Sequence, residues 1–347
     1  MKKITFILGS MGRGGAERVI SILSRSYAER GYQTDIIVLL SNEVGYELHP
    51  STRVIDFSGN TASRIKRLPY WIKSIRGYVK ENKPDVVVAF AARVNLIVIN
   101  ALTGLNTKLI VSERNDPRHD GRSFLVDILV KLQYPSVNAV VFQTKRAKSC
   151  FKNLKNSVII PNPITVNTYS HSVDKNKVVS VGRLTAQKNH NLLLEAFADV
   201  SKKFPLSYLE IYGKGELEND LRNKINKLGL KEKVFLQGNV NDVHTRISDA
   251  AVFCLTSDYE GLSNAFLEAM MMGIPCVSTN CAGADEYIRN GENGFLVNIG
   301  DKQQLVFAIE KLLANEELRN IFSSKAIKEL QTVTSENIIK RWDKLIL

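Results

Sequence analysis

Cysteine is scarce in this sequence, and its pattern matches no disulfide framework. The 347 residues include four cysteines, none of them in a Cys-x-x-Cys pair: Cys150, Cys254, Cys276 and Cys281. Disulfide-held secreted proteins and zinc ribbons both need paired or closely spaced cysteines. The chain therefore belongs to neither class, and the cysteine pattern predicts a reducing, cytoplasmic location.

Long apolar runs are also missing. A helix that crosses a bilayer needs about 20 mostly apolar residues. The nearest approach, Val86–Leu102, is interrupted by Arg93, Asn95 and Asn100. Near the start, Ile4–Leu8 is too short for the apolar part of a signal peptide and runs into a glycine-rich segment. We expect neither a membrane-spanning helix nor a secretory leader.

Metal-binding patterns are absent as well. The chain contains no Asp-x-Asp, and Asp258-x-Glu260 comes nearest to it. The five histidines lack the spacing of metal ligands. They are His49, His119, His171, His190 and His244. We expect no bound metal and no other cofactor.

Charge is plentiful, but it is divided unevenly along the chain. The 47 Lys and Arg residues against 35 Asp and Glu give a net charge of +12. Residues 1–170 hold 25 basic and 12 acidic residues, a net of +13, whereas residues 171–347 hold 22 and 23, a net of −1. The total alone does not choose between nucleic acid, an anionic membrane and a phosphorylated substrate. Its confinement to one half favours an electrostatic task over a basic surface kept for solubility.

Short apolar runs alternate with helix-periodic segments along the whole chain. Candidate strands in the first half are 4–8, 35–40, 53–57, 85–90, 108–112, 139–143 and 158–160, and in the second half 177–181, 208–212, 234–236, 252–256, 276–279 and 295–297. Candidate helices include 16–30, 63–81, 189–204, 216–228, 264–272 and 301–314. This alternation predicts an α/β protein with two doubly wound parallel sheets. A stretch rich in Pro, Asn and Ser separates the two sets and predicts a linker over 166–176. Ligands of such sheets bind at the carboxyl ends of the strands, so we expect a site between the halves.

The first predicted strand runs into a glycine-rich loop that opens a helix, Gly9-Ser10-Met11-Gly12-Arg13-Gly14-Gly15. Glycines at such a place let backbone N–H groups approach an anion. A dinucleotide-binding loop would need a third glycine where Glu17 stands, and an acid where the second strand ends at Leu40-Ser41. A Walker loop would need Gly-Lys-Ser/Thr. An anion-binding loop and a plain tight turn both stay open.

Two basic residues follow the first strand of the second half. Gly182-Arg183-Leu184 ends that strand, and Lys188-Asn189 leads into the next helix. An Arg fork and a mobile Lys, five residues apart, can hold a diphosphate from two directions. The alternative is that both side chains are simply solvated.

Two glutamates flank a glycine turn further along the chain. Glu260 precedes the turn 261–264, and Glu268 lies one turn into an otherwise apolar helix. The turn offers backbone N–H groups and the positive end of the helix dipole, and carboxylates accept hydrogen bonds from sugar hydroxyls. A buried carboxylate needs a partner or a ligand. The alternatives are a loop acid at 260 and an ion-paired helix acid at 268.

Taken together, these motifs resemble family 4 retaining glycosyltransferases over almost the whole chain. The motifs are Gly14-Gly15-Ala16-Glu17-Arg18, Gly182-Arg183-Leu184 with Lys188-Asn189, Gly213-Lys214-Gly215, and Glu260-x7-Glu268 followed by Ala269-Met270-x-x-Gly273-x-Pro275. The resemblance implies the GT-B fold, in which two Rossmann-like domains face each other across a cleft and a C-terminal helix crosses back to the first. The implied domains are 1–165 for the acceptor and 177–332 for the nucleotide-sugar donor, with a returning helix over 333–347.

The resemblance also implies roles for individual residues. Arg183 and Lys188 would hold the donor diphosphate and stabilise the leaving group, and Glu260 would contact the donor sugar. Glu268 would bind the nucleotide ribose, with the backbone at 238–240 facing the base. The residues expected to bind the donor are Gly15, Gly182, Gly238, Val240, Gly261, Leu262, Ser263, Asn264 and Glu268.

One stretch departs from the family pattern. Many members carry a His directly after the strand at 108–112, where this chain reads Ser112-Glu113-Arg114-Asn115-Asp116-Pro117. Arg114 occupies the place of that His, and His119 follows five residues later. Glu113, Arg114 and His119 are therefore expected to face the acceptor or the donor sugar. Relatives with this stretch are similar to transferases that build bacterial surface glycans.

The implied reaction moves a hexose or N-acetylhexosamine from a nucleotide sugar, UDP-linked in preference to GDP-linked, by metal-independent front-face displacement. The acceptor is expected to be a glycan, in particular one linked to a polyprenyl diphosphate.

The segment 64–80 mixes six cations with Leu68, Tyr70, Trp71 and Ile72, which suits an anionic membrane surface. An ordinary surface helix is the alternative. We thus expect a cytoplasmic enzyme that docks peripherally on the plasma membrane.

Three other functions compete with this interpretation. A sugar-nucleotide epimerase or hydrolase would share the fold. A nucleic-acid-binding protein would share the charge, but the chain has no reader motif, and we expect no nucleic acid partner.

Overall fold

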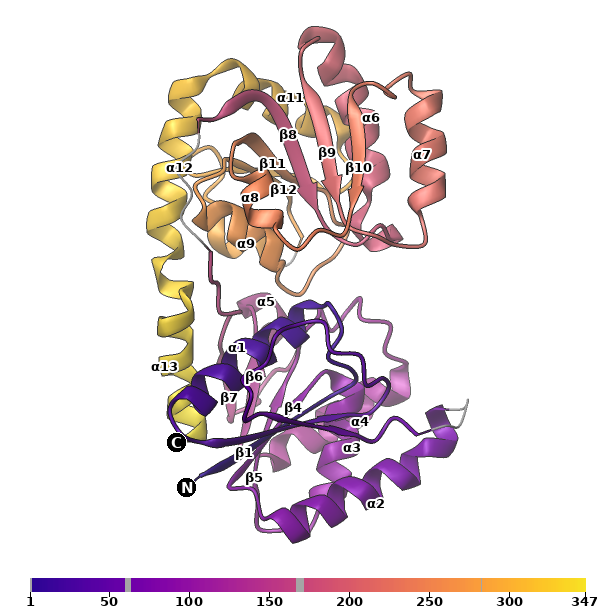
Figure 1. Ribbon diagram of the computed structural model, residues 1–347, viewed down its shortest axis with the longest axis vertical. Helices are drawn as coiled ribbons and strands as arrows, with labels where there is room; N and C mark the ends of the chain where they lie inside the picture. Colours follow the sequence, from indigo (N-terminus) through magenta and orange to yellow (C-terminus); the bar gives the residue numbers. More distant parts are fainter. Residues whose placement is uncertain (1, 60–63, 167–171, 282) are drawn as a thin grey trace. The chain divides into compact units, whose positions relative to one another are not determined.

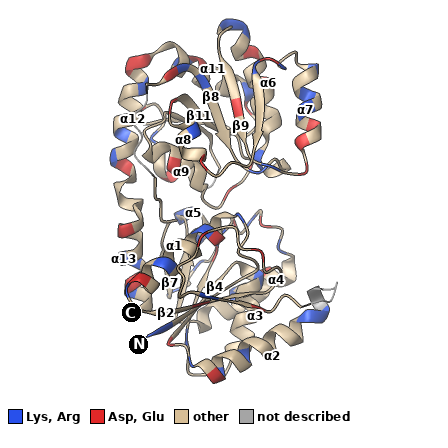
Figure 2. Ribbon diagram, viewed as in Figure 1, with Lys and Arg blue, Asp and Glu red and all other residues tan. Residues whose placement is uncertain are grey.

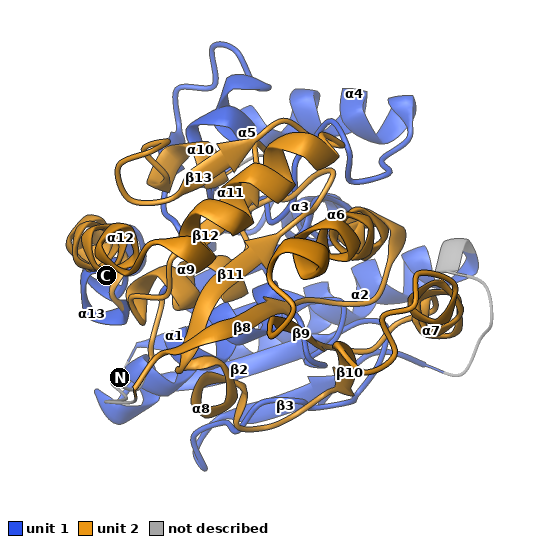
Figure 3. Ribbon diagram, turned by 90° about the horizontal axis from the view of Figure 1, so that it is seen from above, with its two compact units in different colours: residues 1–163, 335–347 blue, residues 164–334 orange. Residues whose placement is uncertain are grey.

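The computed structural model describes residues 2–59, 64–166, 172–281 and 283–347. The chain divides into two compact units (Figure 3). Unit 1 comprises Met1–Pro163 with Ser335–Leu347, and unit 2 comprises Ile164–Thr334. His171 and part of the predicted linker lie outside the described residues.

Unit 1 is built on a parallel sheet with the strand order β3-β2-β1-β4-β5-β6-β7 over its described residues (Figure 1). The strands are β1 (Lys3–Leu8), β2 (Gln33–Val38), β3 (Arg53–Asp56), β4 (Val86–Phe90), β5 (Lys108–Ser112), β6 (Ala139–Phe142) and β7 (Ser157–Ile159). Every residue of β4 and β6 is buried. Such continuous burial is typical of parallel strands covered by helices on both faces.

The helices of unit 1 divide between those two faces. They are α1 (Gly15–Glu29), α2 (Arg64–Asn82), α3 (Ala92–Leu102), α4 (Phe124–Gln133), α5 (Lys145–Ser149) and α13 (Ser335–Ile346). Val87 and Ala89 of β4 pack into the apolar cluster with α2 and α3. Phe90, the next residue, points to the opposite face and stacks on Trp342 of α13 with ring centroids 6.1 Å apart.

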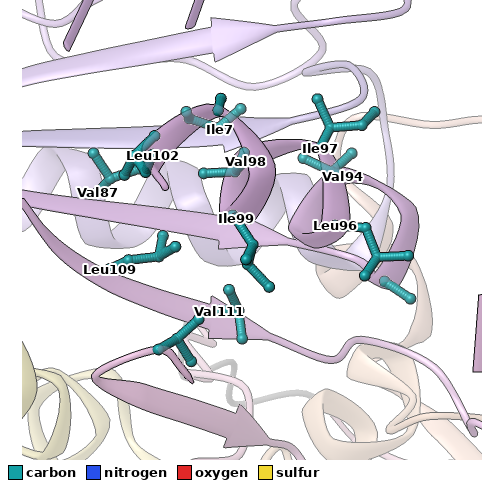
Figure 4. Close-up of a cluster of buried hydrophobic side chains, with 14 of the residues drawn as sticks. Ile7, Val87, Val94, Leu96, Ile97, Val98, Ile99, Leu102, Leu109 and Val111 are labelled. Carbon is teal, nitrogen blue, oxygen red and sulfur yellow. The ribbon is translucent and has the colours of Figure 1, made fainter. Parts of the chain in front are cut away.

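The longest apolar stretch of the sequence becomes a strand and a helix. Val86–Leu102 divides at Ala91, whose φ of 78° ends β4 and starts α3. The apolar residues of α3 fill the space over β4 and β5 (Figure 4). Asn95 within this helix is buried and donates to the Ser112 carbonyl at 3.2 Å and to the Tyr134 hydroxyl at 2.9 Å. The described residues include no helix with the length and apolar character needed to cross a bilayer.

Unit 2 contains a second parallel sheet, with the order β10-β9-β8-β11-β12-β13 over its described residues. Its strands are β8 (Asp174–Val181), β9 (Tyr208–Tyr212), β10 (Val234–Gly238), β11 (Ala250–Leu255), β12 (Cys276–Thr279) and β13 (Phe295–Val297). Its helices are α6 (His190–Lys203), α7 (Glu218–Lys227), α8 (Val243–Ile247), α9 (Asn264–Met271), α10 (Ala284–Tyr287), α11 (Lys302–Ala314) and α12 (Glu316–Leu330). The predicted α/β class with two doubly wound parallel sheets is confirmed. Strand β8 begins three residues before its predicted start at Lys177, because Asp174 already pairs with Ala250 of β11.

The last helix of the chain, α13, belongs to unit 1. The Arg30 guanidinium at the end of α1 forms an ion pair with Asp343 at 2.8 Å. The Lys2 ammonium donates to the Leu347 carbonyl at 2.7 Å. Trp342 is fully buried. These two polar contacts at the surface and the buried Trp342 side chain hold α13 on unit 1.

Helix α2 corrects one prediction. The sequence pattern placed Trp71 among residues suited to a membrane surface, but Trp71 is only 3% exposed. Its indole N–H donates to the Phe57 carbonyl at 2.9 Å. The side chain therefore packs in the core of unit 1, because it lies on the face of α2 that contacts the sheet.

Candidate active site

Three glycine-containing loops meet at the carboxyl ends of β8, β9 and β10. The Gly182 amide donates to the Tyr212 carbonyl at 2.9 Å, and the Gly213 amide donates to the Gly238 carbonyl at 2.8 Å. Gly213 has a φ of 141°, and a Cβ there would lie 2.0 Å from the Gly182 carbonyl oxygen. The loops approach too closely for any side chain at 213, so this residue must be glycine.

Lys188 lies against this group of loops. A Cβ at Gly182 would lie 3.2 Å from the Cδ and Cε atoms of Lys188, so the glycine makes room for the lysine stem. The Lys188 ammonium forms an ion pair with the Glu260 carboxylate. Their side chains are 12% and 9% exposed, respectively. The structure thus brings together two of the three residues predicted to be catalytic.

Further hydrogen bonds hold Glu260 in place. The Ser257 hydroxyl donates to its Oε1 atom at 2.7 Å. Gln187 donates to the neighbouring Tyr259 carbonyl at 2.9 Å. A carboxylate that accepts hydrogen bonds from a hydroxyl and an ammonium is held in one orientation.

The segment that carries Lys188 is tied to the segment that carries Glu260. The Asn189 side-chain amide donates to Asp258 at 2.8 Å, and the Thr256 hydroxyl donates to the Lys188 carbonyl at 3.0 Å. Asn189 has a φ of 44°, and its side-chain oxygen accepts from the Leu192 amide at 3.2 Å to cap α6. Asparagine suits this position because it tolerates the left-handed conformation and caps the helix.

Arg183 and His190 border the same turn. Arg183, the third predicted catalytic residue, is exposed and follows Gly182, the first residue after β8. His190 is the first residue of α6 and is buried. Burial lowers the pKa of His190 to about 4. This imidazole is therefore neutral near pH 7 and adds no positive charge to that of Arg183 and Lys188.

Glu268 has a partner that the sequence pattern did not reveal. Its carboxylate is buried within α9 and lies 2.9 Å from the Nε2 atom of His244, on α8. The Ser263 hydroxyl caps α9 by accepting from the Phe266 amide at 3.4 Å. His244 stands 24 residues before Glu268, so the tertiary fold, not local sequence, brings the two side chains together.

The other donor-binding candidates line the loops of unit 2. Gly238, with a φ of 69°, ends β10, and Val240 follows it half-buried. Gly261, Leu262 and Ser263 form a buried turn that leads into Asn264, the first residue of α9. A Cβ at Gly283 would lie 3.0 Å from the Gly261 carbonyl oxygen, so this turn is closely packed against the loop after β12.

Four predicted site residues belong to unit 1. Gly15 opens α1, after Gly14 in the N-cap position with no side-chain cap. Glu113 follows β5 and is 2% exposed. Its carboxylate accepts from the Tyr134 hydroxyl and from Arg122 at 2.8 Å. Burial raises the pKa of Glu113, and the Arg122 guanidinium opposes this rise.

Arg114 lies beside two aromatic rings that stack on each other. Its guanidinium carbon is 4.4 Å from the Phe90 ring centroid and 5.8 Å from that of Trp342. Its Nη1 atom donates to Asn162 at 2.9 Å, and its Nε and Nη2 atoms are buried without an acceptor among the described residues. Burial lowers the pKa of Arg114 to about 9. His119, in contrast, has a 52% exposed side chain, with Nδ1 at 3.1 Å from Asp116.

The predicted site residues of unit 1 thus differ in their exposure to solvent. Glu113 and Arg114 are engaged inside the unit, and His119 faces outward. In unit 2, Lys188 and Glu260 form one centre, and Glu268 with His244 forms another. No group of three His, Cys, Asp or Glu side chains suited to a metal ion occurs in the described part of the chain.

Two family models match the chain in succession. "Glycosyltransferase Family 4" matches residues 13–168, and "Glycosyl transferases group 1" matches residues 164–329. Both models describe glycosyl transfer. They do not support the alternatives of a sugar-nucleotide epimerase, a sugar-nucleotide hydrolase or a nucleic-acid-binding protein.

Relatives and solved structures agree with the models. The chain is 27% identical to an uncharacterized glycosyltransferase of Haemophilus influenzae, with all of both chains covered. It is 29% identical to the GalNAc-alpha-(1->4)-GalNAc-alpha-(1->3)-diNAcBac-PP-undecaprenol alpha-1,4-N-acetyl-D-galactosaminyltransferase of Campylobacter jejuni, covering 100% of this chain and 98% of that protein. The crystal structure of Anabaena HepE in complex with UDP superposes with a TM-score of 0.83 at 18% identity and covers 99% of each chain. The chain belongs to the family 4 glycosyltransferases, and its fold is GT-B.

Proposed function

We propose that this glycosyltransferase moves a hexose or N-acetylhexosamine from a UDP-sugar to an oligosaccharide linked to a polyprenyl diphosphate, in the assembly of a bacterial surface glycan. The name of the Campylobacter relative supports the acceptor, because that protein acts on an undecaprenol-diphosphate-linked glycan. The UDP complex of HepE supports the nucleotide.

The partly buried Lys188–Glu260 pair is the observation that carries the proposal. Lys188 and the exposed Arg183 bind the donor diphosphate and stabilise the negative charge that develops on it as the glycosidic bond breaks. Glu260, oriented by Ser257, accepts hydrogen bonds from the donor sugar. The acceptor hydroxyl attacks the anomeric carbon from the side on which the diphosphate leaves, so the product retains the anomeric configuration.

The nucleoside occupies the second centre of unit 2. Glu268 accepts hydrogen bonds from the ribose hydroxyls, and His244 holds its carboxylate in the required orientation. The backbone at Gly238 and Val240 faces the base. The two cations provide the charge that a divalent metal supplies in other nucleotide-sugar enzymes, so the reaction proceeds without one.

Unit 1 receives the acceptor. Its basic surface suits a phosphate-containing glycolipid and an anionic membrane, and His119 is its exposed candidate for contact with a sugar. The protein then works on the cytosolic face of the plasma membrane.

The test is transfer by the full chain from UDP-, GDP- and ADP-sugars to a synthetic polyprenyl-diphosphate glycan. We expect turnover with a UDP-sugar, unchanged by EDTA, and an anomeric proton coupling in the product that matches the donor. An inverted product would contradict the mechanism, and loss of turnover in EDTA would contradict metal independence. Rapid hydrolysis of the donor without acceptor would indicate a hydrolase.

A further inference from the structure

Helix α4 exposes apolar side chains that none of the described residues covers. Phe124 is 82% exposed, Leu125 64% and Leu132 70%, and Ile128 is exposed between them at 36%. We call these four residues the α4 patch. Their spacing along Phe124–Gln133 places Phe124, Ile128 and Leu132 on one side of the helix.

The opposite side of α4 is apolar as well. Val130 is fully buried, and Val126 and Leu129 pack against the core of unit 1. A surface helix normally buries one apolar face and presents polar residues to water. Because α4 is already anchored by its inner face, the α4 patch is not needed for folding. Exposed apolar patches of this kind mark surfaces that bind a membrane, another protein or a ligand.

The helices beside the patch carry a strong positive charge. Helix α3 packs against both α2 and α4, so the three form one layer on the sheet. The sequences of these helices contain eight Lys and Arg residues and two acids, Glu81 and Asp127. Lys66 and Lys73 on α2 and Arg93 on α3 are exposed. Figure 2 shows the charged residues along α2.

We propose that the α4 patch inserts into the interfacial region of an anionic lipid bilayer, while the cations of α2 and α3 attract its headgroups. Apolar side chains beside cations are the combination that binds such a surface. The inference rests on the proposed function, in which the acceptor is carried by a membrane lipid. It assigns insertion chiefly to α4, whose exposed apolar side chains are the larger set. On α2, Trp71 is buried, and Leu68 and Tyr70 are 38% and 48% exposed beside the cations.

The charge argues against a second copy of the chain as the occupant. Two copies that met through this layer would bring eight cations against eight cations, with only two acids on each side. Like charges at close range oppose association, whereas anionic headgroups neutralise them.

The experiment is co-sedimentation of the full chain with vesicles of phosphatidylcholine alone or with phosphatidylglycerol. We expect strong binding only to the anionic vesicles, weakened by added salt. Phe124→Gln/Leu132→Gln should weaken that binding by about tenfold or more, since each side chain loses its apolar burial. Lys66→Gln/Lys73→Gln should weaken binding and flatten its salt dependence.

Matched controls come from unit 2. Leu206 and Phe307 are 77% and 56% exposed, so Leu206→Gln/Phe307→Gln removes comparable apolar surface elsewhere. Lys227 and Lys231 are exposed and serve as controls for the charge change. Both control variants should bind vesicles as the unmodified chain does. Circular dichroism and the UDP-induced rise in melting temperature verify that each variant is folded.

Four outcomes would overturn the proposal: no binding of the unmodified chain to anionic vesicles, unchanged binding of the Phe124/Leu132 variant, an equal loss in the unit 2 controls, or a dimer that this variant converts to a monomer. Vesicle binding without sugar transfer would contradict the proposed function and leave the α4 assignment standing.

Discussion

The Lys188 ammonium and the Glu260 carboxylate form an ion pair at the carboxyl ends of the unit 2 strands, with little of either side chain exposed. A partly buried pair stabilises the fold only while both members are present, because each compensates the desolvation of the other. The same two residues are proposed to meet the donor diphosphate and the donor sugar. The proposed function thus couples stability and catalysis at this pair.

Replacing Lys188 tests that coupling. Lys188→Ala should lower kcat by on the order of 10²-fold or more, because a positive charge at the leaving group is lost. It should also lower the free energy of unfolding by about 3 kcal/mol, because Glu260 stays buried without its cation. Steady-state kinetics and denaturant unfolding measure the two effects.

The double variant Lys188→Ala/Glu260→Gln separates them. It should recover much of the stability without recovering activity, since Gln leaves no unpaired charge. Lys203→Ala is the control, because Lys203 pairs with Glu310 on the surface and its loss should cost less than about 1 kcal/mol. Near-normal turnover of Lys188→Ala would refute the diphosphate assignment.

His244 should act as a positioning residue for Glu268. His244→Ala should raise the KM for the donor by about tenfold with a smaller change in kcat, since nucleotide binding loses an oriented acceptor. His244→Gln should restore part of the affinity, because its amide can donate to the carboxylate. The control is His49→Gln in unit 1, where the imidazole bonds the nearby Ser51. A fall in kcat at constant KM would contradict the positioning role.

Burial of His190 predicts acid sensitivity of unit 2. The folded-state pKa is about 4 against 6.5 in the unfolded chain, so the unfolded state binds more protons between these values. The contribution of the neutral His190 to the free energy of unfolding is fully present above about pH 6.5. It is lost as the pH falls towards 4, and the total loss is about 3 kcal/mol. The readout is the difference in unfolding free energy between pH 7.5 and 5. His190→Gln should reduce this difference between the two pH values. An equal difference in the unmodified chain and the variant would contradict the lowered pKa of His190.

Trp342 should secure α13 to unit 1. Trp342→Ala should lower the free energy of unfolding by about 3–5 kcal/mol, because it opens a cavity beside Phe90 and removes one of the two rings beside Arg114. Hydrogen exchange should show faster opening of α13. Trp342→Phe should keep most of the packing, and the exposed Lys340→Ala should change little. Unchanged exchange in Trp342→Ala would show that the ion pair of Arg30 and Asp343 suffices.

Much of the unit 2 site could be predicted from local sequence. Gly213, Lys188 and Glu260 stand where strands end and helices begin, and parallel strands collect such positions at one edge of a sheet. The close approach of Gly213 to Gly182 is the physical reason for the glycine. The pairing of Glu268 with His244 could not be predicted, because the two residues lie on different helices with no fixed spacing.

The sequence by itself determined the two parallel sheets, because runs of β-branched residues between amphipathic helices have few other ways to bury their apolar surface. Its charge asymmetry likewise pointed to the first half as the place of electrostatic work. Only the tertiary structure decided which side chains face inward. Trp71 and the Arg114 guanidinium are buried, and Phe124 and Leu132 are exposed. Sequence hydropathy treats every apolar side chain alike, whereas burial depends on which neighbouring helix or strand covers it.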